Sequence, residues 1–204
     1  MRYDPEHKAR TRARIEAVAS ARFRREGIDA VGVASLMETA GLTHGGFYAH
    51  FKSKDALIAA AIAIGFGQTT ERLRERMARH PALPRAVAFM GAYLNERHRD
   101  HPETGCAAAT LAVEIGRGSD AVRRVFTEHL ESLVDCARAP ADDAGGGSHN
   151  APALAGSPAQ RQEAGLAAVA LAIGALILSR AVDDPGLSRR LLEAGVRASW
   201  RLSD

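Results

Sequence analysis

The sequence has little of what stabilises disulfide-rich or β-rich proteins. Aromatic residues make up 5% of its 204 residues, and two cysteines, Cys106 and Cys136, are too few for a disulfide framework. Alanine contributes 41 residues, which favours helices and argues against a β-sandwich or barrel. The first residues lack the apolar core of a signal peptide, so we expect a cytoplasmic protein.

The sequence also lacks a long hydrophobic run. Residues 164–179 carry no charge, but this segment is shorter than the roughly 20 apolar residues that span a bilayer, and Ala and Gly dilute it. Such a segment is typical of a buried helix or a subunit interface. We therefore expect no membrane-spanning segment.

Signatures of catalysis and of phosphate loops are missing as well. The sequence contains no Gly-x-Ser-x-Gly, no His-Glu-x-x-His and no phosphate-binding loop. His98, His101 and Cys106 lie near one another, but they lack the paired spacing of a structural zinc site. We expect no enzymatic activity, no cofactor and no bound metal.

Basic charge is concentrated in the first quarter of the chain. Residues 1–54 have a net charge of +4, whereas the remaining residues have a net charge of −1. Seven basic residues fall between Lys8 and Arg25, with Glu16 as the one acidic residue among them. This cluster favours a polyanionic partner, although a solvated helix face would have the same composition. Both interpretations remain open for the cluster's last members, Arg22, Arg24 and Arg25.

The hydrophobic pattern is helical, and it predicts an all-α chain of about nine helices. Gly27 and Gly41 are expected to end the first two helices, while Thr43 and Ser53 cap the next two. Residues 140–156 have the composition of a surface loop. The later helices are predicted near Pro84–His98, Gly105–Ile115, Ser119–Ala139, Pro158–Ala181 and Pro185–Leu202.

The segment Val33–Phe51 predicts a helix-turn-helix, because two short helices flank a turn at Gly41. In this motif the second helix lies in a DNA major groove. The positions expected to be exposed are small, polar or aromatic, and none is acidic: Thr43, His44, Gly45, Gly46, Tyr48, Ala49 and His50. Lys52 and Lys54 follow directly, the second at a helix N-terminus that also favours an anion.

This segment resembles the TetR family of transcriptional regulators. The resemblance is carried by Ala40-Gly41-Leu42, Phe47-Tyr48-Ala49-His50-Phe51 and Lys52-Ser53-Lys54-Asp55-Ala56-Leu57-Ile58. It implies a three-helix helix-turn-helix DNA-binding domain over residues 1–52, a helical ligand-binding and dimerisation domain over residues 53–204, and a homodimer joined through residues 158–181 and 185–202. The implied function is that of a repressor which binds a palindromic double-stranded DNA operator and is released by a small-molecule or thiol-reactive inducer.

The resemblance also implies roles for individual residues. Tyr48 matches a tyrosine whose hydroxyl meets a phosphate, and Lys54 matches a lysine that contacts the DNA backbone. Gly46 stands where many members have Thr or Ser, so base reading is expected to depend on His44, His50 and the basic arm at Lys8–Arg12. The DNA-binding residues expected are Lys8, Arg10, Arg12, Thr43, His44, Gly45, Tyr48, His50, Lys52 and Lys54.

The segment that begins Gly105-Cys106 resembles the start of the sixth helix in a subset of the family, some members of which sense electrophiles or oxidants. A thiol just inside a helix N-terminus would be activated by the helix dipole, although Cys106 as a small packing residue remains an alternative. Five apolar or aromatic residues are expected to line a ligand cavity or to form plain core: Phe66, Phe89, Met90, Tyr93 and Phe126.

One alternative function remains open, that of a helical enzyme or interaction module with an incidental basic N-terminus. Sequence-specific, salt-sensitive binding to a short duplex distinguishes the two possibilities.

Overall fold

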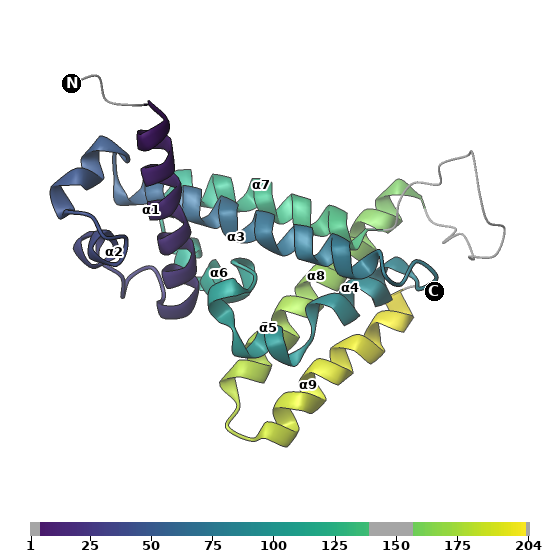
Figure 1. The fold of residues 1–204 in the computed structure, drawn as a ribbon. Helices are drawn as coiled ribbons and strands as arrows, with labels where there is room; N and C mark the ends of the chain where they lie inside the picture. The colour runs from purple at the N-terminus through teal and green to yellow at the C-terminus, as the bar shows by residue number, and fades with distance from the viewer. Residues whose placement is uncertain (1–4, 139–156, 203–204) are drawn as a thin grey trace. The chain divides into compact units, whose positions relative to one another are not determined.

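The computed structural model describes residues 5–138 and 157–202, which fold as helices without strands (Figure 1). The loop predicted over residues 140–156 lies outside these ranges. The all-α prediction is confirmed. In chain order the helices of the described ranges are α1 (Pro5–Glu26), α2 (Val33–Thr39), the 3-10 helix η1 (His44–Ala49), α3 (Lys54–Met77), α4 (Arg85–Tyr93), α5 (Glu96–Asp100), the 3-10 helix η2 (Pro102–Thr104), α6 (Ala108–Gly116), α7 (Asp120–Ala137), α8 (Pro158–Ala181), α9 (Pro185–Ala198) and the 3-10 helix η3 (Ser199–Leu202).

The chain forms two compact units. The first extends to Thr69 and includes His101–His129, whereas the second comprises Thr70–Asp100 and the chain from Leu130 onward. The long helices α3 and α7 each contribute residues to both units. The functional boundary expected between residues 52 and 53 stays a prediction.

The first unit begins with helices that end where the glycines predict. Gly27 and Gly41 have φ angles of 91° and 67°, a left-handed conformation that a β-carbon would strain. After α2, the Gly41 amide donates to the Glu38 carbonyl oxygen at 2.9 Å, and the Leu42 amide donates to that of Met37 at 2.8 Å. This pair of bonds is a Schellman motif, which satisfies the last carbonyls of the helix.

The core of the first unit joins α1 to the helix-turn-helix. Ile15, Ala19 and Phe23 of α1 are fully buried, at the spacing that the sequence predicts for one helix face. The largest side chains buried with them in this unit are Leu36, Met37, Phe47, Leu57, Ile62, Phe66 and Leu111. Burial of a side chain of this size stabilises a fold by about 1.5–3 kcal/mol, so this core holds η1 firmly.

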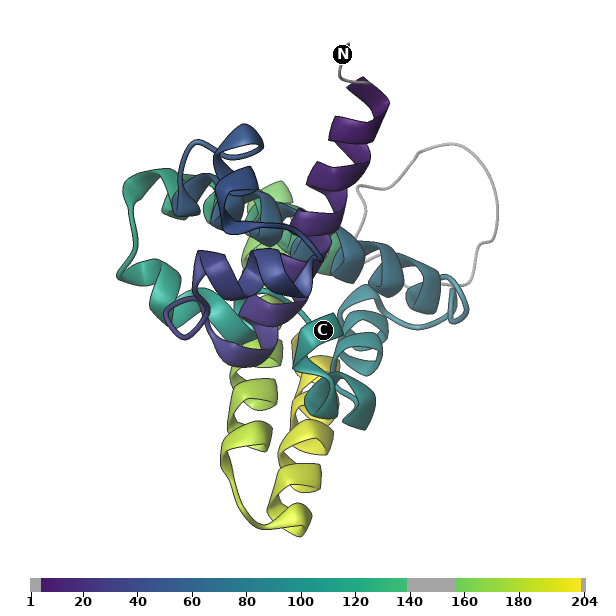
Figure 2. The same ribbon diagram turned by 60° about the vertical axis from the view of Figure 1, so that its left-hand side comes forward.

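The second unit contains an antiparallel hairpin of α8 and α9 (Figures 1 and 2). The sequence Ser157-Pro158-Ala159-Gln160 predicts a capping box at the start of α8, and this prediction is confirmed: the Gln160 amide donates to Ser157 Oγ at 3.3 Å, and the Ser157 amide donates to Gln160 Oε1 at 2.7 Å. Asp184 caps α9 by accepting the Gly186 and Leu187 amides.

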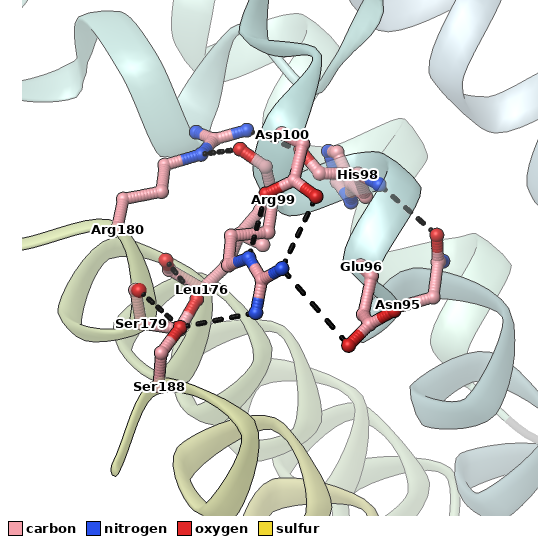
Figure 3. A network of polar contacts seen from close by, with 9 residues as sticks. All are labelled: Asn95, Glu96, His98, Arg99, Asp100, Leu176, Ser179, Arg180 and Ser188. Carbon is pink, nitrogen blue, oxygen red and sulfur yellow. Dashed lines mark hydrogen bonds and ion pairs between the residues drawn. The ribbon is translucent and has the colours of Figure 1, made fainter. Parts of the chain in front are cut away.

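A polar network ties α5 to this hairpin, as Figure 3 shows. Arg180 donates to the backbone carbonyl oxygens of Arg99 and His98 at 2.9 and 2.5 Å. Arg99 in turn makes a bidentate pair with Asp100, at 2.7 and 3.1 Å, and donates to Ser188 Oγ at 3.1 Å. Charge-assisted bonds of this kind are the strong ones in proteins, so the network fixes α5 on α8 and α9.

The single helix predicted over residues 84–98 is wrong. α4 ends at Tyr93, the buried Leu94 is extended, and α5 begins at Glu96. Asn95 explains the interruption, because its Oδ1 accepts the His98 amide at 3.0 Å and so caps the next helix. Asparagine side chains compete in this way for backbone groups that a continuous helix would use.

Candidate nucleic-acid interface and sensor region

The second helix of the helix-turn-helix is a 3-10 helix, η1, and its aromatic residues face opposite ways. Phe47 is 1% exposed and stacks on the buried Phe51 with ring centres 5.6 Å apart. Tyr48, the next residue, is 69% exposed, with its ring edge-on to Phe47 at 5.2 Å. The core therefore anchors η1 from below and presents the Tyr48 phenol on the outer surface.

The outer surface of η1 has the expected composition. Thr43, His44 and Gly45 are exposed together with Tyr48, and no acidic residue occurs between Thr39 and Lys54. The prediction that the Thr43 side chain caps this helix is wrong: no backbone amide donates to its hydroxyl. The hydrogen bond from the Gly46 amide to the Thr43 carbonyl oxygen, at 3.0 Å, has the i to i−3 spacing of a 3-10 turn.

The basic arm on α1 contains exposed cations and one cation, Arg12, that bonds to the end of another helix. Lys8 is exposed, and Arg10 makes only an exposed ion pair with Glu6 at 3.2 Å, which is weak. Arg12 is engaged: its Nη1 donates to the His50 carbonyl oxygen at 2.6 Å, and its guanidinium lies 4.4 Å from the Phe51 ring centre. Arg12 thus fastens α1 to the end of η1.

Arg22 and Arg24 have internal partners, which the sequence did not reveal. Arg22 donates to Ser35 Oγ at 2.5 Å and pairs with Glu26 at 2.7 Å, so it links α1 to α2. Arg22 and Arg25 hold the pKa of the Glu26 carboxyl down to about 2 by hydrogen bonding. Arg24 is buried and donates to the Gly105 carbonyl oxygen at 2.7 Å. Of these three arginines, only Arg25 is exposed.

Lys54 also has a structural bond. Its Nζ donates to the Ile28 carbonyl oxygen at 2.9 Å, in the loop between α1 and α2. The Ile28 and Asp29 amides of the same loop donate to the Glu114 carboxylate of α6, at 3.0 and 3.2 Å. α3 and α6 therefore hold this loop from both sides. The predicted cap on α3 is confirmed, since the Ala56 amide donates to Ser53 Oγ at 3.1 Å.

His50 ends η1 and is half-buried. Its Nδ1 is buried without a hydrogen-bond partner among the described residues. Burial lowers the pKa of the imidazole below 6.5, and repulsion from Lys8, Arg12 and His7 lowers it further. His50 is therefore neutral at pH 7 and contributes polarity rather than positive charge to this surface.

Cys106 lies in the first unit but not inside a helix. α6 begins at Ala108, so the expectation of a thiol within the first turn is wrong. Its side chain is fully buried, and the preceding carbonyl, that of Gly105, accepts from Arg24 and from Thr69 Oγ1. In Cys136, burial raises the pKa of the thiol, which makes it a poor nucleophile at neutral pH.

The five residues expected to line a ligand cavity or to form plain core are divided between the two units. Phe66 and Phe126 belong to the first unit, where their rings meet edge-on at 5.4 Å. Phe89, Met90 and Tyr93 belong to the second and are fully buried. Phe66, Phe89, Met90 and Tyr93 are buried, and their part in a ligand cavity stays a prediction.

Two cavities of the second unit are lined by other residues. One, of about 320 Å³, lies among α5, α8 and α9, and Arg99, Asp100, Arg180 and Asp183 supply its charged lining. The other, of about 420 Å³, lies between the end of α3 and α4. The sequence predicts neither cavity, although the stretch from Arg76 to Asn95 beside the second one contains no Asp or Glu.

Residues 15–61 match the family described as bacterial regulatory proteins, tetR family. This range contains most of α1, the whole helix-turn-helix and the start of α3. Among curated proteins, no sequence matches the chain.

Several solved structures share the fold over nearly the whole chain. A TetR-family transcriptional regulator from Streptomyces coelicolor is 24% identical with a TM-score of 0.70, over 100% of this chain and 97% of that one. The reduced form of NemR from E. coli is 17% identical with a TM-score of 0.68, over 94% and 95% of the two chains. FadR from Bacillus subtilis, in complex with stearoyl-CoA, is 17% identical with a TM-score of 0.61, over 90% and 97%. The N-terminal segment of the chain thus matches the tetR family model, and the fold of the whole chain is similar to that of TetR-family transcriptional regulators.

Proposed function

We propose that the protein is a repressor that binds a palindromic operator as a homodimer and leaves it when an inducer binds. The observation that carries this proposal is the outer surface of η1, which is exposed, free of acidic residues and supported from below by the buried Phe47 and Phe51. A surface of this kind approaches phosphates without repulsion and reaches base edges in the major groove.

The residues of this surface take different roles in the proposal. Lys8 and Lys52 are exposed cations that pair with phosphates, and the Tyr48 hydroxyl donates to another phosphate. Thr43 and His44 stand at the start of η1, where they read base edges. Arg12 and Lys54 act chiefly by positioning η1 and the neighbouring loop, because their internal bonds hold these segments in place.

The proposed dimer forms through α8 and α9. The exposed side of α8 is apolar: Leu166, Ile177 and Leu178 are 43%, 39% and 53% exposed, and Ala167 and Ala170 lie on the same side. α9 and η3 add the exposed Leu187 and Trp200. Among the described helices, α8 alone is long and apolar enough to cross a membrane by length and composition, because it extends beyond the uncharged residues 164–179, but 39% of its apolar window is buried inside the fold. A second copy related by two-fold symmetry would remove this apolar surface from water.

Two kinds of inducer are compatible with the similar structures, one of which holds stearoyl-CoA and another of which is a reduced form. A small molecule is the signal we favour, because the second unit has a cavity of suitable size. A thiol-reactive signal at Cys106 would first require local opening, since that side chain is fully buried. Cys106→Ser distinguishes the two: it abolishes the response to an electrophile and leaves the response to a non-covalent ligand intact.

The test is a gel shift with DNA from upstream of the protein's own gene and a random duplex of equal length as competitor. We expect Tyr48→Phe to weaken binding to both duplexes alike, and His44→Ala to reduce discrimination between them by about 1–3 kcal/mol. Arg124→Ala, an exposed change on α7, serves as the control. Absence of binding to any duplex at low salt would favour the alternative of a helical interaction module.

A further inference from the structure

The cavity between α3 and α4 has one cationic side and one apolar side. Arg76, Arg79 and His80, at the end of α3 and in the turn after it, supply the cationic side. The apolar side consists of Leu83, Val87, Ala88, Gly91 and Ala92, from the following loop and α4. Its volume of about 420 Å³ falls within the range of about 300–1,000 Å³ that is usual for small-molecule sites.

The positive charge of this cavity is not balanced from within its lining. Among the described residues no Asp or Glu lines the cavity, and none occurs in the sequence between Arg76 and Asn95. Arg76 Nη1 donates to the Ala92 carbonyl oxygen at 3.1 Å, which holds its planar guanidinium at the cavity edge. Arg79 and His80 are exposed. A guanidinium offers a fork of N–H donors whose geometry suits a carboxylate.

Arginines at the C-terminal end of a helix also complement its dipole, and this role requires no ligand. The helix dipole accounts for the arginines but not for the apolar side of the cavity. Gly91 is the informative residue: it lies within α4, and a β-carbon there would meet nothing within 4 Å. Gly91 is exposed, so the cavity wall is open at this position, although glycine inside a helix costs about 1 kcal/mol relative to alanine.

The cavity among α5, α8 and α9 gives a useful contrast. It also contains two arginines, Arg99 and Arg180, but Asp100 and Asp183 line it as well. Arg99 is matched by Asp100, and Arg180 is bonded to backbone carbonyls. An anion entering that cavity would have to displace these bonds. In the part of the chain that the structure describes, the cavity between α3 and α4 has no such carboxylate in its lining.

We propose that the cavity between α3 and α4 binds a small organic anion, a carboxylate joined to an apolar chain or ring. The carboxylate pairs with Arg79 and the remaining N–H groups of Arg76, while the apolar part lies against Val87, Ala88 and Gly91. In the regulator proposed above this anion is the inducer, and that part of the inference rests on the proposed function.

The test uses the full-length protein and three probes of equal chain length but different charge: octanoate, octanol and octylamine. Isothermal titration calorimetry measures each affinity at a constant salt concentration. We expect octanoate to bind at least tenfold more tightly than the other two. Arg79→Glu should weaken octanoate binding at least tenfold because it places a carboxylate at the site of the anion. Gly91→Leu, which fills the cavity, should weaken octanoate binding at least as much.

Two matched controls separate the cavity from general effects of charge and size. Arg124→Glu reverses an exposed charge on α7, and Gly67→Leu adds the same side chain to an exposed helical glycine of α3 with open space around it. Both controls should bind octanoate like the wild type, and thermal melts verify that all four variants fold. Equal affinity for the three probes, octanoate binding unchanged in Arg79→Glu and Gly91→Leu, or no binding at all would each overturn the proposal.

A second measurement, operator binding with and without octanoate, is scored separately. Release of the operator by octanoate, lost in Gly91→Leu but not in Gly67→Leu, supports the inducer role. Octanoate binding without release overturns that role. If the protein binds no DNA, the proposed repressor function fails, while the calorimetric result for the cavity stands by itself.

Discussion

Lys52 and Arg12 are both assigned to DNA contact by the sequence, yet their surroundings predict opposite effects of substitution. Lys52 is exposed. Arg12 donates to the His50 carbonyl oxygen at 2.6 Å, pairs with Glu16 at 2.8 Å and lies 4.4 Å from the Phe51 ring centre. We therefore expect Lys52→Ala to alter the salt dependence of DNA binding, and Arg12→Ala to alter the stability of the domain.

The magnitudes follow from these contacts. A hydrogen bond from a charged group contributes about 1.5–3 kcal/mol, and a cation over an aromatic ring, where the cation stays in contact with water, about 0.5–1 kcal/mol. The pair with Glu16 adds less than about 1 kcal/mol, since the Arg12 side chain is 47% exposed and screened by water. Because these contributions overlap, Arg12→Ala should lower the free energy of unfolding by about 2–4 kcal/mol. Lys52→Ala should change it by less than about 0.5 kcal/mol.

For DNA binding we expect the larger effect from Lys52→Ala and the smaller one from Arg12→Ala. Each lost phosphate contact flattens the plot of log K against log salt by about 0.9, so Lys52→Ala, present twice in a dimer, should flatten it by about 2. Arg12→Ala should leave the slope unchanged. The assays are fluorescence anisotropy on a labelled operator at several salt concentrations and urea unfolding followed by circular dichroism. A flatter slope and unaltered stability in Arg12→Ala would refute this reasoning, because the guanidinium would then contact phosphate rather than His50.

Three further predictions concern the second unit. Burial lowers the pKa of His98 from 6.5 to about 4, so the unfolded chain binds a proton more readily than the folded protein does. The free energy of unfolding should therefore be highest above pH 6.5 and fall by about 3 kcal/mol as the pH drops to about 4. Urea unfolding of His98→Gln should lack this pH-dependent fall. Gly195→Ala should destabilise by about 1–3 kcal/mol, because its β-carbon overlaps Leu94 Cδ1, whereas Gly174→Ala, with open space, should stabilise in the same thermal melts. Leu178→Asp, on the exposed side of α8, should yield monomers in light scattering; an unchanged dimer would place the interface elsewhere.

The elements that the sequence predicts well depend on local chemistry. The left-handed conformations at Gly27 and Gly41, the capping box of Ser157 and the cap at Ser53 each involve residues within about one turn of one another. The break at Asn95 was missed because its side chain competes with a helix that the hydrophobic pattern alone would continue.

The sequence by itself determines the all-α fold, the helix-turn-helix and the acid-free surface of η1, because periodicity, glycine positions and composition are local properties. Only the tertiary structure decides which cations of the basic cluster remain available. Arg22, Arg12 and Arg24 bond to groups 13, 38 and 81 residues away, and no pattern along the chain encodes such partners. The cavity between α3 and α4 likewise exists only once a turn has brought the apolar residues of α4 beside the arginines of α3. Hydrogen bonds and cavities depend on three-dimensional proximity, which long-range packing creates.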